Sequence, residues 1–165
     1  MGLHIISGGQ TGVDRAALDV ALELKLPCGG WCPLGRRAED GRIPKRYPLQ
    51  EITSINYPVR TRANVRDSDG TLILTRGIPD RGTKLTRDVA ARLGKPCLVV
   101  DLNRPVLLAV VRKWMMDHDI GVLNVAGPHE SSQPGIHAQA SDVLRRLLKS
   151  PRAKSQPKKT ARRKE

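Results

Sequence analysis

The chain has 165 residues and a formal net charge of +13, and 39% of its residues are hydrophobic but only 2% aromatic. That length predicts one domain with a sizeable core packed from Leu, Val, Ile and Ala. The sequence has neither an apolar run of about 20 residues nor a signal-peptide pattern, so we expect no membrane partner. Three cysteines, an odd number, without a secretory signal indicate reduced thiols and a cytoplasmic location.

The positive charge is unevenly spread along the chain. Eight of the 29 Lys and Arg residues fall within residues 149–165, where Pro, Ser, Ala and Thr leave nothing to bury. We therefore expect one domain at residues 1–149 and a disordered basic tail at residues 150–165. A solubilising tail is favoured over a nucleic-acid-binding arm because no base-reading module accompanies it, and weak polyanion binding by the tail is the alternative.

Short apolar runs alternate with helical patterns over residues 3–148. In chain order the sequence predicts a strand at 3–6, a helix at 14–24, a strand at 28–31, a long polar loop at 32–49, a helix at 57–67, a strand at 70–74, a glycine-rich loop at 77–83, a helix ending at 93, a strand at 96–100, a helix at 105–118, a strand at 122–125 and a helix at 134–148. Short, nearly all-apolar strands are typical of a parallel sheet that is buried on both faces. The predicted fold class is therefore α/β, with a Rossmann-like, doubly wound, parallel five-stranded sheet and helices on both faces.

Polar loops that contain glycine follow four of the five predicted strands, at residues 8–12, 32–41, 75–83 and 126–131. In sheets of this kind ligands bind at the carboxyl ends of the strands. Loops on a rigid scaffold are also where binding sites are usually built. We therefore expect the four loops to meet at one edge of the sheet and to form a cleft.

The first of these loops, Gly8-Gly9-Gln10-Thr11-Gly12, leads directly into a helix. Free N–H groups and the helix dipole attract anions at a helix N-terminus. The three glycines remove side chains that would block the approach, and Thr11 can cap the helix or bind a phosphate oxygen. The loop lacks the Gly-Lys-Ser/Thr ending of a P-loop and the G-x-G-x-x-G dinucleotide pattern. We favour phosphate binding over a tight strand-to-helix turn, and we expect Gly82-Thr83, at the start of a later helix, to be a second phosphate contact.

The second loop brings charged side chains to the same edge of the sheet. The guanidinium groups of Arg36 and Arg37 can each form two hydrogen bonds with a phosphate or a carboxylate. Glu39 and Asp40 can act as acid or base, or accept hydrogen bonds from the N–H groups of a heterocycle. The alternative is a solvated surface loop whose charged residues pair with one another.

Other polar residues give weaker signals. Asn64 and Asp67, from the helix before the third predicted strand, are candidates to point into the cleft, although Asp67 fits a helix stop equally well. Cys28 and Cys32 supply only two thiols where a structural zinc site needs four ligands, so no metal site is predicted, and a ligand role for Cys32 alone stays open. No Ser-His-Asp or Cys-His pair suggests a nucleophilic enzyme.

Five stretches, SGGQTGVDRAALDVAL, GWCPLGRRAEDG, NVRDSDGTLIL, KPCLVVDL and LNVAGPHES, resemble the putative molybdenum carrier family, which is Rossmann-like and related to the LOG, or lysine-decarboxylase-like, superfamily of nucleotide phosphoribohydrolases. The resemblance covers residues 3–148. It implies a parallel sheet of strand order 3-2-1-4-5, self-association, and binding of molybdenum cofactor or another phosphorylated, nucleotide-like ligand. The ligand-binding residues that it implies are Gly8, Gly9, Gln10, Thr11, Gly12, Gly35, Arg36, Arg37, Glu39, Asp40, Gly82 and Thr83.

One departure from the hydrolase relatives bears on activity. Their motif Pro-Gly-Gly-x-Gly-Thr-x-x-Glu supplies a catalytic Glu, and Thr86 stands at that position here. A threonine hydroxyl cannot act as a carboxylate acid or base near neutral pH. We therefore expect a carrier or binding protein rather than an enzyme, holding a phosphorylated ligand at the carboxyl edge of the sheet. The alternatives are a LOG-like nucleotide phosphoribohydrolase in which Glu39 or Asp40 replaces the missing Glu, and polyanion or nucleic-acid binding through the tail.

Overall fold

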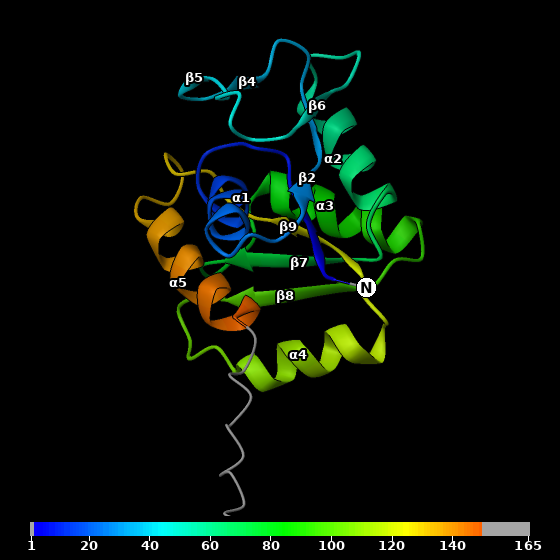
Figure 1. The fold of residues 1–165 in the computed structure, drawn as a ribbon, viewed down its shortest axis with the longest axis vertical. Coiled ribbons are helices and arrows are strands. Elements are labelled where there is room, and N and C mark those ends of the chain that lie inside the picture. The colour runs from blue at the N-terminus through cyan, green and yellow to red at the C-terminus, as the bar shows by residue number, and fades with distance from the viewer. Residues whose placement is uncertain (1, 150–165) are drawn as a thin grey trace, which may run out of the picture.

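A computed structural model describes residues 2–149 of the protein, and the predicted basic tail at residues 150–165 lies outside the described residues. The main sheet has five parallel strands, which confirms the predicted fold class (Figure 1). They are β1 (His4–Ile6), β2 (Cys28–Gly29), β7 (Gly70–Thr75), β8 (Cys97–Asp101) and β9 (Val122–Ala126). The helices are α1 (Val13–Glu23), α2 (Tyr57–Arg66), α3 (Arg81–Arg92), α4 (Leu108–Asp117), which begins later than the predicted residue 105, and α5 (Ile136–Leu148).

The order of the strands differs from the order that the resemblance implies. In space it is β2-β1-β9-β7-β8, so the predicted 3-2-1-4-5 order is wrong when strands are counted along the chain. β9 lies in the middle, where Leu123 pairs with Ile5 of β1 and with Gly70 of β7. Leu123 and Val125 are fully buried, as a central strand requires. Counted from β9 as the first strand, the order does read 3-2-1-4-5.

Helices cover both faces of the sheet and enclose two unequal cores (Figure 1). On one face α1, α4 and α5 bury the larger core, in which α1 packs along α5. Ala16, Ala17 and Ala21 of α1 are fully buried, and these small side chains allow the helices to approach closely. On the other face α2 packs on α3 over a smaller core that contains Val65, Val89 and Ala90. No helix among the described residues is both long and apolar enough to cross a membrane.

The segment predicted as a long loop at residues 32–49 has structure of its own. β3 (Trp31–Cys32) pairs with β6 (Gln50–Glu51), and β4 (Arg37–Ala38) forms a hairpin with β5 (Gly41–Arg42). The strand predicted at 28–31 is therefore broken, because Gly30 turns the chain with a φ of 125° that favours glycine. We call residues 33–50 the insert. It has a small core, which consists of Leu18 of α1 with Cys32, Ile43, Tyr47 and Leu49.

Arg36 holds the insert together from inside. Its side chain is buried, and its guanidinium donates hydrogen bonds to the carbonyl oxygens of Ile43, Pro44, Tyr47 and Leu49 over distances of 2.9–3.0 Å. The left-handed backbone at Arg36, with a φ of 53°, turns the side chain into this nest of carbonyls. Arg36 therefore stabilises the insert, where four of its five N–H donors are used.

Candidate functional site

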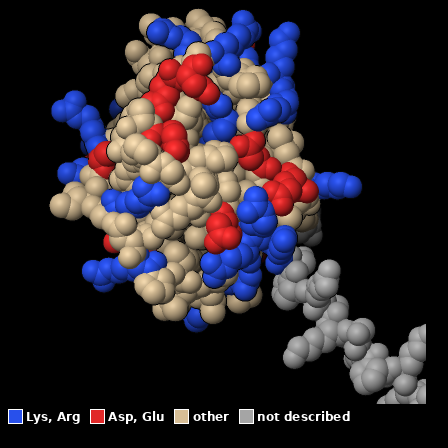
Figure 2. Space-filling model, turned by 90° about the vertical axis from the view of Figure 1, so that its left-hand side faces the viewer, with Lys and Arg blue, Asp and Glu red and all other residues tan. Residues whose placement is uncertain are grey.

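A cleft of about 460 Å³ lies at the carboxyl edge of the main sheet. Its walls come from the loop after β1, the insert, the starts of α2 and α3, and the loop after β9, so the prediction that four loops meet here is confirmed. Figure 2 views the molecule from the side on which the strands end and shows acidic and basic side chains mixed over this face. The lining residues include Gln10, Asp14, Glu39, Tyr57, Arg60, Asp80, Gly82, Thr83, Thr86, Gly127 and His129.

An ion pair between α1 and α2 lies on the wall of the cleft. The Nη1 atom of Arg60 lies 2.8 Å from the Oδ2 atom of Asp14, and the exposed fractions of the two side chains are 13% and 4%. Burial raises the pKa of the Asp14 carboxyl, and the charge and hydrogen bond of Arg60 oppose that effect. A buried ion pair with a perturbed carboxyl in a cleft is a common property of functional sites.

The glycines of the first loop make room for neighbouring parts of the protein. A Cβ atom on Gly8 would lie 1.6 Å from the Nη1 atom of Arg60, so a larger residue there would displace the guanidinium from its present position. A Cβ atom on Gly9 would meet Leu49 of the insert at 2.4 Å, and one on Gly12 would meet the carbonyl oxygen of Pro128 at 2.3 Å. At each of the three positions a side chain would meet another part of the protein, and this explanation for the glycines does not appear in the sequence pattern.

Two residues that line the cleft each have a buried polar atom without a partner among the described residues. These atoms are the hydroxyl of Thr83 and the Nε atom of Arg60. Thr83 is 4% exposed and lines the cleft, and its backbone N–H donates to the carboxylate of the N-cap residue Asp80 over 2.7 Å. Buried polar groups are normally paired, so these two groups mark a place where a ligand can supply the missing partners.

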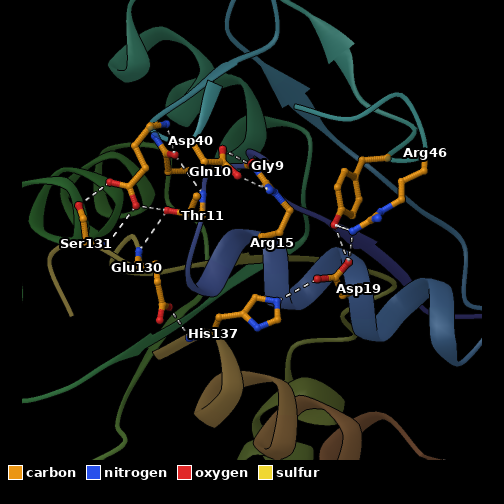
Figure 3. A network of polar contacts seen from close by, with 12 residues as sticks. Gly9, Gln10, Thr11, Arg15, Asp19, Asp40, Arg46, Glu130, Ser131 and His137 are labelled. Carbon is orange, nitrogen blue, oxygen red and sulfur yellow. Dashed lines mark hydrogen bonds and ion pairs between the residues drawn. The ribbon is translucent and has the colours of Figure 1, made fainter. Parts of the chain in front are cut away.

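Glu39 connects the insert to the two neighbouring loops through hydrogen bonds with Thr11 and Ser131, two residues labelled in Figure 3. Its carboxylate accepts hydrogen bonds from the backbone N–H and the hydroxyl of Ser131, at 3.1 and 2.5 Å, and from the hydroxyl of Thr11. Its own N–H donates to the side-chain oxygen of Gln10 over 2.9 Å. Burial acts to raise the pKa of Glu39, but the hydrogen bonds from Ser131 and Thr11 outweigh it and lower the pKa.

We expect the substitution Glu39→Gln to lower the free energy of unfolding at pH 7 by about 1 kcal/mol, since it weakens charge-assisted hydrogen bonds at a partly exposed site. A carboxyl whose pKa is lowered in the folded state stabilises the protein above its ordinary value of 4.5, and this contribution is lost as the pH falls through the folded value. Denaturant unfolding of both proteins from pH 7 to pH 3 measures the difference, which should vanish at the acid end. A difference that does not change with pH would contradict the assignment.

Glu39 also lines a second pocket, of about 610 Å³, between α1, the insert and α5. Asp40 forms a salt bridge there with Arg15, whose Nη1 atom lies 3.0 Å from the carboxylate. The hydroxyl of Tyr47 donates to Asp19 over 2.6 Å, and the Nε2 atom of His137 lies 2.9 Å from the other oxygen of Asp19 (Figure 3). This network ties the insert to both helices.

The predicted site residues separate into four groups in the structure. Gln10, Glu39, Gly82 and Thr83 line the cleft. Gly8 and Asn64 line a small recess that shares Asp14 and Arg60 with the cleft, and Thr11, Gly12 and Asp40 line the second pocket. Gly9, Gly35, Arg36 and Arg37 line neither pocket nor the recess. A role of any of these residues in ligand binding stays a prediction.

The sequence analysis does not identify Asp14 and Arg60 as site residues, and a spacing signal exists for Arg60 alone. Arg60 lies four positions before Asn64, which places both on one face of α2. Asn64 exchanges hydrogen bonds with the backbone of Trp31, at 2.8 and 3.0 Å, and so holds α2 against β3. The pairing of Arg60 with Asp14 depends on how α1 and α2 pack, which no local pattern records.

Comparisons with known proteins agree with this architecture. Residues 5–148 match the model of the circularly permutated YpsA SLOG family, cpYpsA. The crystal structure of a putative molybdenum carrier protein from Syntrophus aciditrophicus is 47% identical over 89% of this chain and 95% of its own, with a TM-score of 0.87. No curated protein matches the chain. A circular permutation accounts for a strand order that reads 3-2-1-4-5 only when β9 is counted first. The protein is a member of the circularly permutated YpsA SLOG family.

Proposed function

We propose that the protein binds and carries a phosphorylated small ligand in the cleft at the carboxyl edge of the sheet. The ligand is of the size of molybdenum cofactor, a pterin phosphate, or of a nucleotide. The observation that carries the proposal is that two residues lining this cleft, Thr83 in the first turn of the 12-residue helix α3 and Arg60 on α2, each have a buried polar atom, the hydroxyl and Nε, without a partner among the described residues. A hydroxyl, a guanidinium and the positive end of a helix dipole together suit a phosphate group.

The dimensions of the cleft support an organic ligand. Pockets of about 300–1,000 Å³ hold molecules of cofactor size, and the cleft has a volume of about 460 Å³. The neighbour from Syntrophus aciditrophicus is named as a molybdenum carrier, and its chain is nearly half identical to this one. We take molybdenum here as cargo held by its organic ligand. The described residues contain no group of three or more His, Cys, Asp or Glu side chains that could hold a bare metal ion.

A carrier is favoured over a hydrolase by the state of the carboxylates around the cleft. Thr86, at the position of the relatives' catalytic Glu, donates its hydroxyl to the carbonyl oxygen of Gly82 over 3.0 Å. Asp14 is paired with Arg60, and Glu39 accepts hydrogen bonds from two hydroxyl groups. A phosphoribohydrolase with a relocated carboxylate is the second candidate, and it rests on the raised pKa of Asp14, which suits a general acid.

The first test of the proposal is the substitution Thr83→Val, which keeps the shape of the side chain and removes its hydroxyl. Because this hydroxyl has no partner within residues 2–149, stability should stay within about 0.5 kcal/mol of the parent value. Affinity for guanosine monophosphate, used as a probe, should fall about tenfold or more by isothermal titration calorimetry, since a hydrogen bond to a charged group is lost. Equal affinities of the two proteins would contradict the proposal.

A second measurement separates a carrier from a hydrolase. The protein is incubated with a panel of nucleoside monophosphates, and the free base is followed by chromatography. We expect no base release above background. Turnover that Asp14→Asn or Glu39→Gln removes would support the hydrolase candidate instead.

Two further expectations stay predictions. The family resemblance implies self-association, which light scattering on the purified protein would test. Polyanion binding by residues 150–165 would appear as DNA binding that weakens steeply with salt and disappears when those residues are deleted.

A further inference from the structure

The cleft is lined by one exposed tyrosine ring, close to the guanidinium of Arg60. Tyr57, the first residue of α2, is 41% exposed and lines the cleft. The chain has two Trp, two Tyr and no Phe, and among the described residues Tyr57 alone of these aromatic residues lines the cleft. Because the ring lies on the wall of the cleft, it offers a planar apolar surface to a ligand bound there.

The ring of Tyr57 lies at the start of α2, where Asn56 is the extended N-cap residue and Pro58 follows within the first turn of the helix. The guanidinium carbon of Arg60 lies 5.8 Å from the centre of the Tyr57 ring. Pro58 and, from α3, Leu85 line the same cleft, so the ring belongs to an apolar part of the wall that directly adjoins the anion-binding groups.

We propose that Tyr57 is the specificity-determining residue of this site, on which a planar heterocycle of the ligand stacks while the anionic group of the same ligand lies at Arg60 and Thr83. This inference rests on the proposed function and adds a substrate class to it: a heterocycle and an anion joined by a short linker, as in a nucleoside monophosphate or a pterin phosphate. Stacking on an aromatic side chain stabilises different nucleobases to a similar extent, because each of them has a planar π-face.

The volume of the cleft points to the same class of ligand. A single tetrahedral oxyanion would fill only a small part of about 460 Å³ and would leave Tyr57 exposed to water. The separation of 5.8 Å between the Tyr57 ring centre and the Arg60 guanidinium matches a ligand whose ring and anionic group are close together. A bare oxyanion should therefore bind through Arg60 and Thr83 alone.

The experiment compares two probes, inorganic phosphate and guanosine monophosphate, by isothermal titration calorimetry. The proteins are the parent chain, Tyr57→Ala, Tyr57→Phe and Thr83→Val. Val59→Ala is the matched control, because Val59 lies on the same helix, is 39% exposed and does not line the cleft. The parent should bind the nucleotide at least tenfold more tightly than phosphate. Tyr57→Ala should remove most of that ratio and leave phosphate affinity unchanged, whereas Tyr57→Phe and Val59→Ala should keep it.

The outcomes separate this inference from the function on which it rests. If Thr83→Val weakens both probes but Tyr57→Ala leaves the ratio unchanged, the anion site stands and the role of Tyr57 is overturned. If the parent binds both probes equally well, the heterocycle class is overturned. If neither probe binds the parent protein, the anion site fails and the inference fails with it.

Discussion

Replacing Arg60 with methionine is expected to lower the free energy of unfolding by about 3–5 kcal/mol at pH 7, the range seen when one partner of a buried ion pair is removed. Methionine keeps most of the side-chain volume, but it leaves the Asp14 carboxylate without a cation 2.8 Å away, in a place where that carboxylate is 4% exposed. Denaturant unfolding followed by circular dichroism measures the loss. The double variant Asp14→Asn/Arg60→Met should recover most of it, because it leaves no unpaired charge.

The pH dependence of this loss identifies its cause. The pKa of Asp14 is raised in the folded protein, so the contribution of this group to stability is fully present below the ordinary value of 3.8 and is lost as the pH rises through the folded value. Removal of Arg60 raises the folded pKa further. The deficit of the variant should therefore be small near pH 4 and grow toward pH 7. A deficit of equal size at both pH values would indicate lost packing rather than an unpaired charge.

Replacing Arg36 with methionine is the second substitution with a large expected effect. It removes hydrogen bonds to four carbonyl groups inside the insert and should lower the free energy of unfolding by about 2–4 kcal/mol. The loss should be concentrated in residues 33–50, where backbone amide exchange followed by mass spectrometry should become faster.

The neighbouring Arg37 provides the control for this substitution. Arg37 is exposed on β4, so Arg37→Met should change stability by less than about 0.5 kcal/mol. If both substitutions had the same effect, the nest of carbonyls around Arg36 would not be what holds the insert together. If Arg36→Met left amide exchange unchanged and weakened only phosphate binding, that result would support the prediction from the sequence that Arg36 is an anion ligand.

The fold class and the place of the cleft could be predicted because they depend on patterns that are local in sequence. An apolar run such as residues 70–74 needs no distant information to be recognised as a buried strand, and the loop that follows it has to lie at the carboxyl edge. The family resemblance also pointed to the relatives that the comparisons with known proteins find. Gln10, Glu39, Gly82 and Thr83 consequently lie at the cleft, as the spacing of loops and strands indicates.

What the sequence did not reveal depends on packing between distant segments. Gly8 is a glycine because Arg60 lies against it, and Arg36 points inward because four carbonyl groups converge on it. Neither reason is visible in a motif that also fits phosphate binding. The sequence predicts a loop where the insert lies, because the side chains of its small core are spread over many residues without helix or strand periodicity.

The central position of β9 has a consequence for how the protein is made. The ribosome releases β1, β2, β7 and β8 before β9, and these four strands can form only the pairs β1–β2 and β7–β8. Until residues 122–126 emerge, the inner edges of β1 and β7 have no neighbour, and unpaired edges of this kind promote aggregation. His4 must then pair with Val122, a contact between distant parts of the chain of the kind that slows folding. Completion of the sheet is therefore a late event in synthesis, and a nascent chain that stalls before β9 exposes two unpaired strand edges at the same time.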